Sequence, residues 1–273
     1  MQIKTVATRE IRLGFRNSWT YSFLILLTIF TIAILLIQTG VSNTDGYTDV
    51  TGAMMNVTLY LLPLITLLLG GISTVTEKED GNWELLSTYA LSTSSFLFGK
   101  WIGLSIILLT IITFSFGIAG LITVIFGSGL SISSLLFFWT FSSILALVFL
   151  GISIFIGAIT NNRWQTLIGA IGVWFLTIII WPTLLISILS FVPYQWIKPI
   201  LEASTLFNPA ELIRIFAMIK LGAGSVFGSE YDQWVTWMSG SLGSIFFVVL
   251  IIIWITGSLS VGALLWERRD KNR

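Results

Sequence analysis

Residues 77–100 read EKEDGNWELLSTYALSTSSFLFGK, a polar and charged island between two long apolar runs. Five charged side chains fall within the first eight positions of this island, whereas the flanking runs, residues 53–75 and 101–126, contain none. Each run is long enough to cross a lipid bilayer as a helix. A short charged segment between two such runs predicts a loop held against one face of the membrane, where another protein could push on it.

The rest of the chain has the same apolar character. It has 273 residues, of which 55% are hydrophobic and 10% charged, and its mean hydropathy is +0.94. Soluble domains are usually about one quarter charged. The composition therefore predicts an all-α integral membrane protein with six transmembrane helices. The predicted spans are residues 19–38, 53–75, 101–126, 133–159, 167–189 and 242–266.

The distribution of basic residues orients these spans. If the N-terminus is inside, eleven of the 14 Lys and Arg residues lie on the inner side and three on the outer side. Inner loops of membrane proteins are enriched in Lys and Arg. Both termini and the charged island are therefore predicted to be cytoplasmic, in a multi-pass protein of the cell (cytoplasmic) membrane.

Residues 1–18 carry apolar side chains every four positions, with Arg9, Arg12 and Arg16 on another side. This pattern predicts an N-terminal helix in the membrane interface, with the three arginines facing lipid phosphates. The alternative is a basic cytoplasmic tail without such a helix.

The connection between the fifth and sixth spans, residues 191–240, is amphipathic. Asn208, Pro209 and Glu211 form a typical helix start, with a cap, a proline at the first position and an acid in the first turn. We expect a short amphipathic helix on the outer face. Pro182 predicts a kink in the fifth span.

Several classes of function are disfavoured by what the sequence lacks. The chain has no Cys and no His, and its predicted spans contain no charged side chain, so proton-driven transport and metal-dependent catalysis are poorly supported. Intramembrane Ser and Thr are read as helix–helix hydrogen-bonding groups. Apart from Met1, the methionines lie at or beyond the predicted outer face, so a copper conduit through the chain is poorly supported. Most Trp residues, including Trp83 and Trp266, fall near predicted span ends, as membrane-interface tryptophans do.

The island resembles a known family. Residues 77–86, Leu91-Ser92 and 97–100, together with Leu62-Pro63 and residues 207–211, are similar to motifs of the type-2 ABC transporter permeases, most of all the NosY-type permeases of nitrous oxide reductase maturation. Three positions depart from the pattern: Asn82 stands where Thr is usual, Ala90 where Pro is and Thr93 where Arg is.

The resemblance implies one permease domain over residues 1–273, with a coupling loop at about 76–99 and an outer loop at about 191–240. It implies a homodimer in the lipid bilayer that works with two copies of a cytoplasmic ABC ATPase. The ATPase would bind ATP and Mg. This chain would bind no cofactor, metal or nucleic acid and would not itself be an enzyme. A periplasmic or extracellular accessory protein is a further expected partner. The residues expected to contact the ATPase are Glu77, Glu79, Asp80, Gly81, Trp83, Glu84, Leu85 and Leu86, with Gly81 allowing a turn at a helix start.

Two alternatives stay open. The chain could be a generic type-2 ABC exporter of a lipid, peptide or drug, or a structural membrane assembly protein without energy coupling. The last would need no ATPase, so mutating the acidic island would leave its activity unchanged. The sequence names no substrate.

Overall fold

The computed structural model describes residues 2–39, 49–81, 83, 91–125, 132–227 and 232–270, and the elements in these ranges are helices. They are α1 (Gln2–Gly14), α2 (Ser18–Thr39), α3 (Asp49–Glu79), α5 (Thr93–Ile125), α6 (Ile132–Ile159), α7 (Arg163–Trp174), the π-helix η1 (Phe175–Ile180), α8 (Trp181–Ser190), α9 (Tyr194–Phe207), α10 (Pro209–Lys220), the 3-10 helix η2 (Ala223–Phe227), α11 (Asp232–Ser239) and α12 (Ser241–Asp270).

Five helical segments among the described residues are long and apolar enough to cross a membrane: Thr51–Glu79, Thr93–Ile122, Ile132–Ile159, Arg163–Ser190 and Ser241–Arg269. They correspond to the last five of the six predicted spans. α2 contains a shorter apolar stretch, Thr20–Ala33, so the first span stays a prediction. Together these helices make the chain a multi-pass membrane protein.

α6 is the central helix of the bundle. The most apolar window of this span is 78% buried inside the protein, compared with 6% for the span Arg163–Ser190. Glycines let α3 approach α6 closely, because a Cβ on Gly157 would lie 2.7 Å from the carbonyl oxygen of Gly71. Ser153 of α6 also donates a hydrogen bond to the carbonyl of Leu67 in α3. Close backbone approach and interhelical hydrogen bonds of this kind are common in membrane helix pairs.

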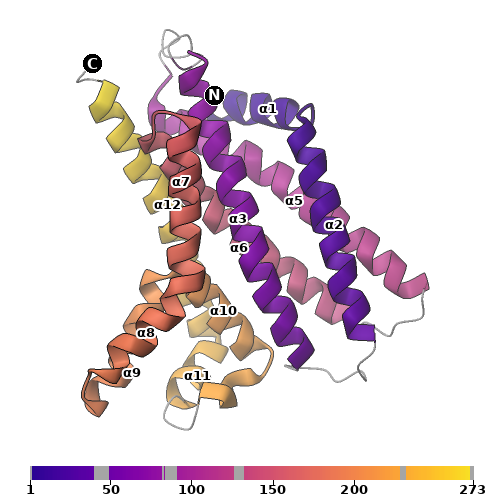
Figure 1. The fold of residues 1–273 in the computed structure, drawn as a ribbon, viewed down its shortest axis with the longest axis vertical. Coiled ribbons are helices and arrows are strands. Elements are labelled where there is room, and N and C mark those ends of the chain that lie inside the picture. The colour runs from indigo at the N-terminus through magenta and orange to yellow at the C-terminus, as the bar shows by residue number, and fades with distance from the viewer. Residues whose placement is uncertain are drawn as a thin grey trace.

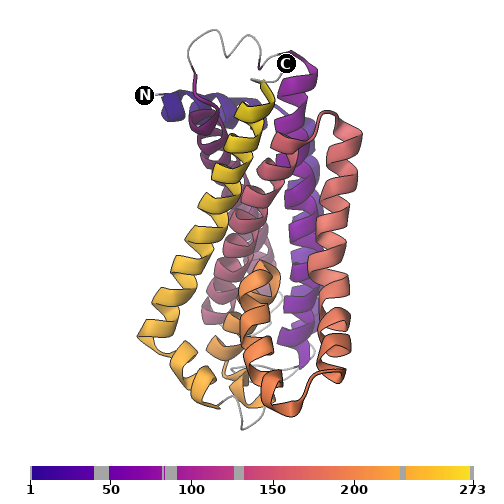
Figure 2. The same cartoon turned by 90° about the vertical axis from the view of Figure 1, so that its left-hand side faces the viewer.

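The two ends of the bundle differ. Figures 1 and 2 show both chain termini at one end, where α1 lies across the bundle, and α10 and α11 at the opposite end. We call the first the terminal end and the second the far end. Both the last turn of α3 and the first turn of α5 lie at the terminal end (Figure 1), so the charged island is there too.

Helical structure extends into both ends of the predicted coupling loop, residues 76–99. Residues 77–79 continue α3, and residues 93–99 belong to α5. The charged side chains of residues 77–79 each contact a neighbouring element, as described below. Gly81 has a φ of 68° and follows the end of α3, and Trp83, two residues later, is again helical. Glycine adopts this left-handed conformation without the steric cost of a side chain.

Two further details differ from the expectations. The irregularity in the fifth span lies before Pro182, where residues 175–180 form a π-helix and Pro182 falls in the first turn of α8. The missing amide of proline removes one helical hydrogen bond, and the wider π turns precede it. The outer loop also contains more helices than the one short helix expected, because the described part of it forms α9, α10, η2 and α11.

Candidate coupling site at the end of α3

Glu77, Lys78 and Glu79 end α3, Asp80 follows directly, and the four charged side chains contact three sets of neighbours. Successive residues of an α-helix point about 100° apart, so the three helical residues fan out around the helix axis. Glu77 faces α1 and α5, Lys78 faces α6 and α12, and Glu79 and Asp80 face the start of α7. We call residues 77–80 the α3 hub.

Lys78 caps the C-terminal end of α6. Its ammonium donates to the carbonyls of Gly157 at 3.2 Å, of Ala158, and of Thr160 at 3.1 Å. The last carbonyls of a helix lack partners within the helix and form the negative end of its dipole, so a cation is favourable there. The same ammonium lies 3.9 Å from the ring centroid of Trp266 in α12. Lys78 therefore connects α3 to both α6 and α12.

α12 holds the end of α6 as well. The guanidinium of Arg269, near the end of α12, donates to the carbonyl of Ile159, the last residue of α6. Cations from two helices thus meet at one helix terminus, which fixes the relative positions of α3, α6 and α12.

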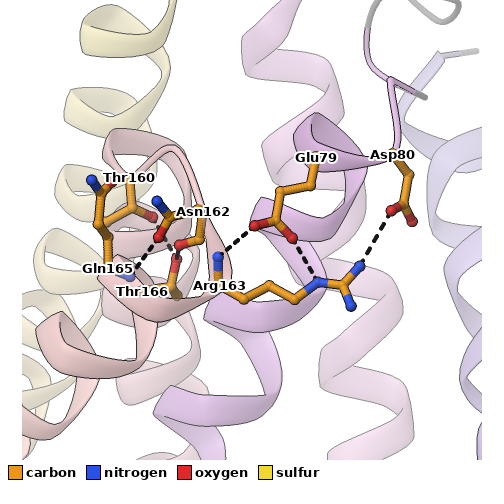
Figure 3. Close-up of polar contacts among 7 residues, drawn as sticks. All are labelled: Glu79, Asp80, Thr160, Asn162, Arg163, Gln165 and Thr166. Carbon is orange, nitrogen blue, oxygen red and sulfur yellow. Dashed lines mark hydrogen bonds and ion pairs between the residues drawn. The ribbon is translucent and has the colours of Figure 1, made fainter.

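Glu79 and Asp80 hold the turn between α6 and α7 through Arg163 (Figure 3). The Nε of Arg163 is 2.7 Å from one oxygen of Glu79, and its Nη2 is 3.2 Å from Asp80. The backbone amide of Arg163 also donates to Glu79 at 2.8 Å. Because the first amides of a helix have no internal partner, the Glu79 carboxylate caps α7 from outside, beside its own cap Asn162, which accepts from the Gln165 amide.

Glu77 points to the other side of α3. One carboxylate oxygen is 3.1 Å from Arg9 in α1, and the other is 3.7 Å from the ammonium of Lys100 in α5. Lys100 also lies 3.0 Å from Glu10 of α1. We call Arg9, Glu10, Glu77 and Lys100 the four-charge cluster.

Trp83 belongs to an aromatic group that joins three parts of the chain. The rings of Trp83, Phe96 of α5 and Trp266 of α12 are packed with centroids 4.8–5.9 Å apart. All three side chains are buried, and Trp83 is only 8% exposed. The ring predicted to anchor an ATPase thus packs against α5 and α12 of this chain.

The predicted site residues are distributed as follows. Glu77, Glu79, Asp80, Gly81 and Trp83 lie together at the terminal end, whereas Glu84, Leu85 and Leu86 lie outside the described residues. Arg12 is exposed on α1, Arg16 is exposed in the turn after it, and Arg9 is partly covered in the four-charge cluster.

The helix-start residues belong to the far end. Asn208 accepts from the Ala210 amide as the cap of α10, Pro209 is its first residue, and Glu211 lies in the first turn beside Arg214. The Asn208 amide group also donates to the carbonyl of Thr177 in η1 at 2.6 Å. This residue therefore ties the outer helix to the fifth span.

Sequence reasoning missed several residues of the site. Lys78 was not separated from its acidic neighbours, Glu10 and Arg163 were not linked to the island, and Lys100 was not expected to pair with Glu10 and Glu77. Trp266, read as a membrane-interface tryptophan, is 2% exposed and packs inside the protein. One available signal was the spacing of Gly99 and Gly103 around Lys100, which favours close packing of another helix beside that lysine.

The arrangement is suited to transmitting displacement. A movement of the hub would reach α1, α5, α6, α7 and α12 through ion pairs, hydrogen bonds and a cation–π contact. Within the ranges that the structure describes, no three acidic side chains gather as metal ligands; the acids of the hub instead face basic groups.

Comparison with known proteins identifies the family. Residues 4–271 match the family described as "ABC-2 family transporter protein". The "Probable ABC transporter permease protein NosY" of Stutzerimonas stutzeri is 28% identical over 237 residues, which cover 83% of this chain and 85% of that protein. The protein of the same description from Pseudomonas aeruginosa is 27% identical over 231 residues, covering 82% and 84% respectively. The chain therefore belongs to the ABC-2 transporter family, as a type-2 ABC permease most like NosY.

Proposed function

We propose that this chain is the membrane subunit of a NosY-like ABC transporter, coupling ATP hydrolysis by separate ATPase subunits to transport or mechanical transmission in copper-site assembly of nitrous oxide reductase. The observation that carries the coupling role is the α3 hub, where four consecutive charged residues connect the island to five helices. The similarity to two proteins described as NosY supports the assignment to that process.

The proposed topology has six spans with cytoplasmic termini, α2 being the first span. α2 is 22 residues long, which is about the length of a membrane-spanning helix. Both termini lie at one end of the bundle (Figure 2), as an even number of crossings requires. In this topology the hub faces the cytoplasm, where ATP is available, and α10 and α11 lie on the outer side.

The proposed mechanism needs no chemistry in this chain. Two copies of the permease pair, and an ATPase subunit docks on each island. When ATP closes the ATPase dimer, the docked segment moves. The hub passes that movement to the α6 terminus through Lys78 and to α7 through Arg163, and rigid helices carry it to the far end.

Glu79 and Asp80 are the best placed acids for contact with the ATPase. Their side chains are 27% and 49% exposed, whereas that of Glu77 is 9% exposed and faces inward. A basic group of the ATPase would compete with Arg163 for these two carboxylates. Docking would then loosen or tighten the link between α3 and α7.

Affinity purification of the tagged chain from native membranes in mild detergent, followed by mass spectrometry, tests the proposal. Recovery of an ATPase and of an outer protein that matures a copper site supports the NosY-like role. Recovery of an ATPase alone favours a generic exporter. An intact preparation without any ATPase would overturn the coupling role and favour a structural assembly protein.

A further inference from the structure

The four-charge cluster is buried at the point where α1, α3 and α5 meet. The Lys100 side chain is 0% exposed, that of Glu10 is 4% exposed and that of Glu77 is 9% exposed. Lys100 lies 3.0 Å from Glu10 and 3.7 Å from Glu77, while Arg9 lies 3.7 Å from Glu10 and 3.1 Å from Glu77. Two cations and two anions thus alternate in a closed, neutral arrangement.

α1 is packed tightly against α5 on both sides of Lys100. A Cβ added to Gly99 would lie 2.7 Å from the Cβ of Val6, and one added to Gly103 would lie 2.6 Å from the Cβ of Glu10. The two glycines therefore bring α1 into direct contact with the α5 backbone. A slide of α1 along α5 would separate Glu10 from Lys100.

Stability alone does not account for such a cluster. Removing charges from water is costly, and well-packed apolar residues of similar volume are often as stable as a buried ion pair. What buried ion pairs add is a defined relative position, because each charge has few acceptable partners.

The position that the cluster defines involves the hub itself. Glu77 precedes Lys78 in the last turn of α3, so the residue that binds Arg9 and Lys100 is the direct neighbour of the one that caps α6. Lys100 is the last residue of the island and lies near the start of α5. The cluster therefore clamps the two ends of the island to one another and to α1.

We propose that Lys100 is a positioning residue that makes α1 part of the moving coupling unit, so that α1 shifts together with the ends of the island when ATP binds. This inference rests on the proposed coupling function. α1 then does more than anchor the chain in the membrane, because its Arg9 and Glu10 hold the ends of α3 and α5 that flank the segment on which an ATPase acts. Loss of the Lys100 charge leaves Glu10 and Glu77 facing one another with Arg9 alone between them.

Distance measurements between spin labels test this proposal, and the absence of Cys in the chain gives a clean background. One reporter pair is Leu13→Cys on α1 with Leu136→Cys on α6, both exposed positions. A second pair, Ser94→Cys with Leu136→Cys, reports on the end of the island. Each distance is measured in the permease–ATPase complex in nanodiscs, without nucleotide and after trapping with ATP and vanadate.

In the otherwise unchanged protein we expect trapping to shift both distances. Lys100→Met should abolish the shift of the α1 pair, whereas Lys100→Arg, which keeps the charge between Glu10 and Glu77, should retain it. If Lys100→Met does not accumulate, the double variant Glu10→Gln with Lys100→Met, which leaves Arg9 and Glu77 as a pair, should accumulate and lose the same shift.

The outcomes separate this inference from the proposed function. A shift of the α1 pair that persists in the Lys100→Met protein overturns the positioning role, and so does a folded Lys100→Arg protein that loses the shift. If the island pair shifts in the unchanged protein but the α1 pair does not, α1 is static and the inference is wrong while coupling stands. If neither pair shifts in the ATPase-bound complex, the coupling function itself fails.

Discussion

Replacing Lys78 by Met removes the ammonium that joins α3, α6 and α12 while keeping a side chain of similar length. Three carbonyls at the end of α6 then lose a charged donor, and Trp266 loses its cation. The carbonyls lie in a partly buried place, so water can replace the ammonium only incompletely.

The expected loss follows from these contacts. Hydrogen bonds to a charged group are worth about 1.5–3 kcal/mol, a cation–π contact about 0.5–2 kcal/mol, and a cation at a helix C-terminus about 0.3–2 kcal/mol. The three contributions involve one ammonium and overlap, so we expect about 3 kcal/mol for Lys78→Met. At about 2–4 °C per kcal/mol for a chain of this size, the apparent melting temperature should fall by about 6–12 °C.

The assay is heating of the detergent-solubilised protein followed by size-exclusion chromatography with fluorescence detection. Lys78→Arg, which keeps the charge, should recover most of the loss, and Lys4→Met on the exposed face of α1 should cause none. A Lys78→Met protein with the same apparent melting temperature as the unchanged protein would refute the view that this lysine holds the α6 terminus.

Three other substitutions probe separate parts of the structure. Arg163→Ala should change the melting temperature little, since its ion pairs are half exposed and such pairs are worth about 1 kcal/mol or less. It should nevertheless reduce ATP hydrolysis by the assembled complex. A rate of hydrolysis equal to that of the unchanged complex would contradict a role of Arg163 in coupling. Gly103→Val should destabilise the protein by about 1–3 kcal/mol through overpacking against α1. Gly117→Val should not, because a Cβ added at Gly117 meets open space. Equal melting temperatures of the two variants would contradict the close packing of α1 against α5. Asn208→Ala should destabilise the protein by about 1–3 kcal/mol, because the cap of α10 and the hydrogen-bond donor to Thr177 are lost together. Asn208→Asp keeps the cap alone, so its melting temperature should lie between those of the Asn208→Ala protein and the unchanged protein. An Asn208→Asp protein that melts at the same temperature as the unchanged protein would contradict the role of Asn208 as donor to Thr177.

Local signals in the sequence predicted local structure well. The Asn208-Pro209 pair stands where α10 begins, because a capping side chain and a proline act within one turn of the helix. Five of the six predicted spans also correspond to long apolar helices, since their length and hydropathy suffice to indicate them. These features depend on neighbours in the sequence and need no knowledge of the fold.

The partners of the charged residues could not be predicted in the same way. Glu77 and Arg9 are 68 positions apart, and Glu79 and Arg163 are 84 positions apart, so nothing local relates them. A charged island between apolar runs indicates a surface, yet Glu77 and Trp83 face inward because α1 and α12 cover them. The sequence shows that charge is present, and only the packing of the helices decides which charges face a partner protein.

The most direct test of the central claim is photo-cross-linking from the α3 hub in native membranes. A photoreactive amino acid at Asp80, whose side chain is 49% exposed, should capture an ABC ATPase subunit, whereas the same group at Val226, exposed at the far end, should not. Capture of the ATPase from Val226, or from neither position in a complex that still contains it, would contradict the assignment of the α3 hub as the place where the ATPase acts.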